Sequence, residues 1–115
     1  MAVDHIVRLP SDESAPRVAR AAIDEWLVGA GPRVHGDART LVTELVTHAV
    51  RRGSPPIELS LVRDGGRLRV EVADAGGPDG PEVPDDWSRR VIDALAERWG
   101  VRGDETRVWV ELQAG

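Results

Sequence analysis

The stretch from Ile57 to Ala73 constrains the fold most strongly, because it encodes two strands and the turn that joins them. Apolar and polar residues alternate with a period of two from Ile57 to Arg63 and again from Leu68 to Ala73. Between these runs lies Asp64-Gly65-Gly66, a sequence typical of the tight turn in a hairpin. Alternation of this kind is typical of strands that bury one face and expose the other. The stretch therefore predicts an antiparallel hairpin with one face against a core.

Three further segments show the apolar spacing of amphipathic helices. The first helix is expected from about Pro16 to Ala30, where apolar residues recur every three or four positions until Gly31-Pro32 ends the pattern. The second is expected from near Asp37, a candidate N-cap, to Gly53. The third is expected from Asp86 to Trp99, with Gly100 as the glycine that ends it.

The remaining segments complete the order of elements along the chain. Short strands are expected from Val3 to Leu9 and from Arg107 to Leu112, and the stretch from Asp74 to Asp85, rich in Gly, Pro and Asp, is expected to be a short, restricted loop. The order is then β-α-α-β-β-α-β in a single domain covering residues 1–115. It favours an α+β fold, a two-layer α/β sandwich whose sheet is mixed but mostly antiparallel, with the helices on one face.

Composition excludes several kinds of catalytic chemistry. The chain has no Cys, Lys, Asn, Phe or Tyr. Without Cys there is no thiolate nucleophile and no zinc finger, and without Lys there is no P-loop cation and no Schiff base. The three histidines, His5, His35 and His48, lie far apart in the sequence, so no metal site is expected.

Charge and hydropathy limit the location and the partners. The N-terminal MAVDHIVRLP carries an acid and a proline where a signal peptide needs a basic and then an apolar stretch, and no apolar run is long enough to cross a membrane. A cytoplasmic protein without a membrane partner is therefore expected. With 20 acidic against 15 basic residues and a formal net charge of −5, nucleic acid is not expected as a partner either.

Three stretches follow each other in the order and spacing of one superfamily. They are LVTELVTHAVRRG at 41–53, LRVEVADAGG at 68–77 and VIDALAERWGV at 91–101, and VWVEL follows at 108–112. On these motifs the chain resembles the GHKL (histidine-kinase-like) ATPases, and most closely the small anti-sigma-factor serine protein kinases. The resemblance covers nearly the whole chain. It implies the Bergerat-type ATP-binding fold of that superfamily, which is an α+β sandwich of the kind predicted above.

The resemblance implies roles for four residues. Glu44 stands at the place of the family's glutamate, which polarises the attacking hydroxyl or water in phosphoryl transfer. His48, one helical turn later, stands where the family has an asparagine that binds Mg²⁺. Asp74 and Gly76 stand at the places of the aspartate that binds the adenine amino group and of a glycine that lets the backbone approach the base. ATP and Mg²⁺ are the cofactors implied for a competent site.

Several positions depart from the family pattern. The imidazole of His48 is a poor ligand for Mg²⁺, which prefers oxygen. Pro78 replaces a glycine at the entrance to the lid, and Asp86 and Ser88 replace the two glycines that cradle the phosphates at its end. Arg107 stands where the family has a threonine that faces the base.

These departures favour a regulatory protein-interaction module of the anti-sigma-factor type, with lost or weak ATP binding and with Glu44 as a vestigial base. The resemblance implies a sigma factor or a STAS-domain antagonist as partner, and a homodimer is left open. The first alternative is an active ATP-dependent serine protein kinase that phosphorylates such an antagonist, with Glu44 as base and Asp74 on the adenine. The second is a small-molecule sensor that uses the emptied adenine cleft. Trp99 and Trp109 are expected in the core.

Overall fold

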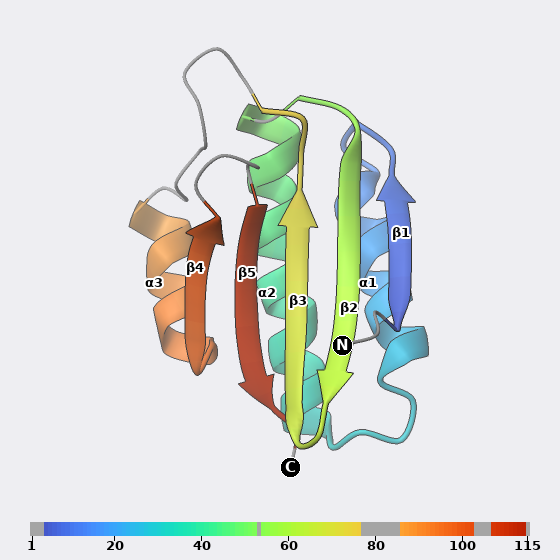
Figure 1. Ribbon diagram of the computed structural model, residues 1–115, viewed down its shortest axis with the longest axis vertical. Coiled ribbons are helices and arrows are strands. Elements are labelled where there is room, and N and C mark those ends of the chain that lie inside the picture. Colours follow the sequence, from blue (N-terminus) through green and yellow to red (C-terminus); the bar gives the residue numbers. More distant parts are fainter. Residues whose placement is uncertain (1–3, 53, 77–85, 103–106, 115) are drawn as a thin grey trace.

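The computed structural model describes residues 4–52, 54–76, 86–102 and 107–114, and these form three helices and five strands (Figure 1). In chain order the elements are β1 (His5–Leu9), α1 (Ala15–Trp26), α2 (Pro32–Arg52), β2 (Ile57–Asp64), β3 (Arg67–Ala73), α3 (Asp86–Leu95), β4 (Arg98–Arg102) and β5 (Arg107–Gln113). The expected loop from 74 to 85, with its three prolines, lies outside the described residues except for 74–76. The described helices are all too short or too polar to cross a lipid bilayer.

The five strands form one sheet in the order β1-β2-β3-β5-β4. Each neighbouring pair is antiparallel, so the described strands form a wholly antiparallel sheet, where the sequence predicts a mixed but mostly antiparallel one. Figure 1 looks onto the sheet from the side without helices; α1 and α2 lie behind the strands, and α3 lies beside β4. The predicted α+β sandwich with the helices on one face is confirmed.

The hairpin of β2 and β3 is also confirmed. Asp64 pairs with Arg67 across a turn in which Gly65 has a φ of +61°, a conformation that glycine adopts without strain. The register places Leu59 opposite Val72, and it directs one face of both strands at α1 and α2. The largest side chains that are almost fully buried in the resulting core are Ile23, Leu27, Leu41, Val42, Val46, Ile57, Leu59, Leu61, Leu68, Val70, Ile92 and Val110.

The boundaries of the first two helices differ from those predicted. Helix α1 ends at Trp26 rather than Ala30, and Gly29, with a φ of +86°, lies in the turn that follows. Helix α2 begins at Pro32 rather than near Asp37. The sequence suggested Pro32 as a terminator of the first helix, but its fixed φ and missing N–H suit the first position of the second helix equally well.

The prediction of a third helix from Asp86 to Trp99 is wrong over its last residues. Helix α3 ends at Leu95, and the chain then forms β4, which pairs with β5. Trp99 lies opposite Val110 and Val101 opposite Val108, so pairing with a distant strand outweighs the local helical spacing.

Gly100 accordingly does not end a helix but lies in β4 opposite Trp109. Trp99 packs against the core as expected, and its Nε1 donates to Asp93 Oδ1 at 2.7 Å. Trp109 does not lie in the core, because the alternation along β5 turns Val108 and Val110 to the helices and Trp109 to the other face.

Two glycine substitutions test this packing. A Cβ at position 100 would lie 2.8 Å from Cζ2 of Trp109, so Gly100→Ala should lower the free energy of unfolding by about 1–3 kcal/mol. Gly36→Ala in α2 is the matched control: nothing lies within 4 Å of its added Cβ, and the change should raise the free energy of unfolding by about 0.5–1 kcal/mol. Urea unfolding measures both. A Gly100→Ala variant as stable as the wild type would contradict the close approach of Trp109.

Candidate functional site

Helix α2 positions two of the residues singled out by the sequence. Leu41, Leu45 and Val46 turn the apolar side of the helix to the sheet and are buried. Glu44 and His48, one turn apart, lie on the flank of the helix and are half-buried. The helix therefore holds a carboxylate and an imidazole side by side at the border between core and solvent.

A serine from the first turn of α3 reaches Glu44. The Oγ of Ser88 donates to Oε2 of Glu44 at 3.1 Å, and Ser88 is only 6% exposed. Ile92, one turn further along α3, is fully buried in the core, which fixes the side of α3 that faces α2. The carboxylate that the sequence suggests as a base is thus hydrogen-bonded to the start of the next helix.

The sequence marks Ser88 only as the replacement of a phosphate-cradling glycine and does not predict its bond to Glu44. The signal that could have found it is the spacing Ser88 to Ile92, which places the hydroxyl on the buried side of the helix. A serine on that side needs a hydrogen-bond partner, and a neighbouring helix supplies one.

Asp74 and Gly76 lie directly after β3, at the end of the central strand and next to the segment that follows α2. Oδ1 of Asp74 accepts a hydrogen bond from the backbone N–H of Gly76 at 2.7 Å, and Gly76 has a φ of +83°. The N–H of Ala75 donates to the carbonyl of Ser54 at 2.8 Å, which joins this turn to the segment after α2. The Asp74 carboxylate therefore shapes a turn, as aspartate often does before glycine.

Arg107 begins β5 and turns away from the helices. Its Nη1 lies 3.8 Å from Oε2 of Glu71, on the face of the sheet without helices. In the described part of the chain, no group of three or more His, Asp or Glu side chains lies close enough together to hold a metal ion.

Glu44 lines a cavity of about 410 Å³ on the side of α2 that faces α1. The other lining residues are Arg20, Gly36, Arg39, Thr40 and Thr43. Arg20 donates from Nη1 to Oγ1 of Thr43 at 3.1 Å, which holds one guanidinium at the wall of the cavity.

The second arginine of this wall, Arg39, pairs with Asp24 of α1, and Nε2 of His35 lies 2.6 Å from the same carboxylate. Hydrogen bonds from Arg39 and then from His35 hold the pKa of Asp24 below its usual value. These contacts tie α1 to α2 next to the cavity.

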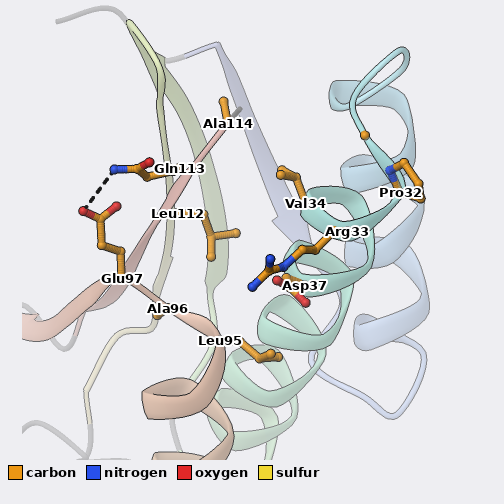
Figure 2. A pocket seen from close by; sticks show the side chains of 11 residues that line it. Pro32, Arg33, Val34, Asp37, Leu95, Ala96, Glu97, Leu112, Gln113 and Ala114 are labelled. Carbon is orange, nitrogen blue, oxygen red and sulfur yellow. Dashed lines mark hydrogen bonds between the residues drawn. The ribbon is translucent and has the colours of Figure 1, made fainter.

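A cavity of about 670 Å³ lies at the N-terminal end of α2, between its first turn and the end of β5 (Figure 2). Its lining residues are Gly31, Pro32, Arg33, Val34, Asp37, Leu95, Ala96, Glu97, Leu112, Gln113 and Ala114. Leu112 pairs with Leu68 at the start of β3, whereas Asp74 follows its end, about 20 Å further along at about 3.3 Å per residue. This cavity contains none of Glu44, His48, Asp74 and Gly76 and is distinct from the predicted site.

No model of a known protein family matches the chain, and no curated protein matches it significantly.

The bond between Ser88 and Glu44 can be measured by a double-mutant cycle. We expect Ser88→Ala and Glu44→Ala to be coupled by about 1.5–3 kcal/mol in the free energy of unfolding, the range for a hydrogen bond to a charged group. Ser60→Ala, which truncates a buried serine on the opposite face of the sheet, is the matched control and should show coupling to Glu44→Ala near zero. Equal coupling in both cycles would refute a specific bond.

Proposed function

We propose that this protein is a regulatory protein-interaction module of the anti-sigma-factor type in which ATP binding is weak or lost. The hydrogen bond from Ser88 to Glu44 is the observation that carries the proposal. A general base needs its accepting oxygen directed at the group it deprotonates. Oε2 of Glu44 instead accepts from a buried hydroxyl, so the geometry favours a structural role for this carboxylate.

The same bond opposes the entry of a nucleotide between α2 and the start of α3. Breaking a hydrogen bond to a charged group costs about 1.5–3 kcal/mol, which would weaken binding by about ten- to a hundredfold. The site residues do not fit Mg²⁺ either, because His48 offers an imidazole where the hard cation prefers oxygen, and the chain contains no Asn. We therefore assign no phosphoryl transfer to this site.

An intact scaffold beside altered polar groups supports a role in recognition. The sheet and the three helices bury a continuous core. If the resemblance holds, the groups suited to phosphoryl transfer have been replaced while the fold is kept. A fold retained without its chemistry is explained most simply by binding to another protein. By the resemblance described above, the proposed partner is a sigma factor or a STAS-domain antagonist, and the proposed location is the cytoplasm.

An active serine protein kinase is the second candidate, and one observation favours it. Glu44 is half-exposed and shares its cavity with Arg20 and Arg39, and guanidinium groups are well suited to stabilise a phosphoryl group during transfer.

Calorimetric titration with ATP and Mg²⁺ separates the two candidates. We expect no saturable heat, or a dissociation constant in the millimolar range, because the nucleotide must displace Ser88 from Glu44. A micromolar constant, which corresponds to about 8 kcal/mol, would contradict the proposal. If heat is observed, Asp74→Asn identifies the site, since it should weaken binding at the predicted adenine position and leave an unrelated site unchanged.

Capture of purified partners tests the interaction itself. The immobilised protein should retain a sigma factor or a STAS-domain antagonist equally well with and without ATP, and Glu44→Ala should retain it to the same extent, because recognition does not use the carboxylate. Binding that strictly requires ATP, or that disappears with Glu44→Ala, would favour the kinase. Binding of neither class of partner would refute the proposed function.

A further inference from the structure

The face of the sheet without helices carries a dense group of arginines. Alternation along β3, β4 and β5 turns to this face Arg67, Arg69, Arg98, Arg102 and Arg107, together with Glu71, Glu111 and Trp109. We call these eight residues the arginine face. In the part of the chain that the structure describes, no helix covers them; Figure 1 looks directly onto the strands that bear them.

Glu111 lies beneath three of the arginines. Oε1 of Glu111 accepts from Nη2 and Nε of Arg98 at 2.6 and 3.0 Å. Nη1 of Arg69 lies 3.5 Å from Oε2, and Nη1 of Arg67 lies 3.9 Å from Oε1. The Glu111 side chain is only 11% exposed, so the guanidinium groups cover it.

Glu71 takes the same position beside the other two arginines. Nη1 of Arg102 lies 3.7 Å from its Oε1, and Nη1 of Arg107 lies 3.8 Å from its Oε2. Arg67 has a further acidic neighbour, Glu97, at 3.5 Å. With this carboxylate counted, the ion pairs of the arginine face join five guanidinium groups to three carboxylates. Glu58 and Asp64 of β2 and Arg8 of β1 share the same side of the sheet. The excess of positive charge is therefore local to β4 and β5, on a chain whose formal net charge is −5.

The arginines also retain donors for a ligand. The side chains of Arg98 and Arg102 are 61% and 56% exposed, although both lie next to a buried carboxylate. A guanidinium carries five N–H donors in a planar fork, and one ion pair uses at most two or three of them. Because both side chains are more than half exposed, a carboxylate that approaches from solvent can reach the remaining donors of Arg98 and Arg102.

Trp109 fixes the middle of the face. Its ring lies against Gly100, where a Cβ would approach to 2.8 Å, and the guanidinium carbon of Arg69 lies over the ring at 4.4 Å from its centroid. This cation–π contact stabilises Arg69 in its position over the ring. It also covers the ring, whereas proteins that bind single-stranded nucleic acid present open rings on which bases stack.

We propose that the arginine face is the docking surface for a short acidic segment of a partner protein, whose Asp and Glu side chains pair with the exposed forks of Arg98 and Arg102. The proposal names the surface used by the interaction module and rests on that proposed function. Charge complementarity selects this occupant. At physiological salt, charges act over only about 8 Å, so a short segment on the face senses the local arginines, whereas a long polyanion would also meet the acidic remainder of the chain.

Fluorescence anisotropy with a labelled peptide of alternating Glu and Ser tests the proposal. The wild type should bind this peptide more tightly at low salt, at about 25 mM, than at about 200 mM. It should not bind the same peptide with Gln in place of Glu. Arg98→Gln combined with Arg102→Gln should weaken binding at least about fivefold, since two charge-assisted pairs are lost.

Arg17→Gln combined with Arg90→Gln is the matched control. It removes the same charge from exposed positions on α1 and α3, and binding should change less than about twofold. Circular dichroism and thermal unfolding show whether each variant folds. Arg102→Gln alone, which leaves the hydrogen bonds of Arg98 to Glu111 intact, serves if the double variant does not fold, and it should weaken binding about twofold to threefold.

Several outcomes would overturn the docking surface. These are no binding of the acidic peptide, equal loss of binding in the control variant, or tighter binding of single-stranded oligothymidylate that the arginine variants abolish. A sigma factor or STAS antagonist captured equally by wild type and by Arg98→Gln/Arg102→Gln would refute this surface and leave the proposed function standing. Peptide binding as expected, with capture of neither partner, would refute the function and support the surface.

Discussion

The alternation of side chains along β3 is the constraint on which the rest of the structure depends. This strand lies at the centre of the sheet, and its Val70 faces Leu61 of β2 on one side and Val110 of β5 on the other. A slip of one residue would expose the buried valine and bring the guanidinium of Arg69 into the core. Correct register therefore creates two unlike layers at once, an apolar layer that holds the helices and a charged layer that faces outward.

Packing against the apolar layer determines the position and the hydrogen-bond partner of the predicted catalytic carboxylate, Glu44. Helix α2 buries Leu41 and Leu45 against it, which leaves Glu44 on the flank of the helix. Helix α3 buries Ile92 in the same core, which directs Ser88 at Glu44. The Ser88–Glu44 hydrogen bond, which we propose opposes nucleotide binding, is thus a consequence of how two helices share one core. The same strands carry the charged layer, which no described helix covers and which we propose as the binding surface.

Local patterns in the sequence predicted the parts of the fold that depend on neighbouring residues. The hairpin from Ile57 to Ala73 follows from period-two alternation around a glycine turn, and the hairpin is confirmed. The predictions that were wrong concern segments whose structure depends on contacts between distant residues. Pairing with β5 makes Arg98–Arg102 a strand in a segment with helical spacing, and it places Trp109 outside the core. Pro32 is compatible with both the end of one helix and the start of the next.

In the candidate site too, local spacing predicts some features, and others depend on packing between distant segments. Motif spacing placed Glu44 and His48 on one side of a helix, and the structure has them there, half-buried. The bond from Ser88 to Glu44 depends on how α2 and α3 pack against each other. No local sequence pattern encodes this packing angle. The sequence does not predict the arginine face either, because its residues come from three strands. Its carboxylates are covered only when these strands pair.

Amide hydrogen exchange with and without saturating ATP and Mg²⁺ tests most directly whether the predicted nucleotide site has been replaced by a contact between two helices. We predict that the amides of α3, and those from Asp74 to Gly76, exchange at the same rates in both samples, because the Ser88–Glu44 bond already holds α3 against α2 in the absence of nucleotide. Exchange that slows across both segments when ATP and Mg²⁺ are added would show that a nucleotide enters between the helices, and it would contradict the central claim.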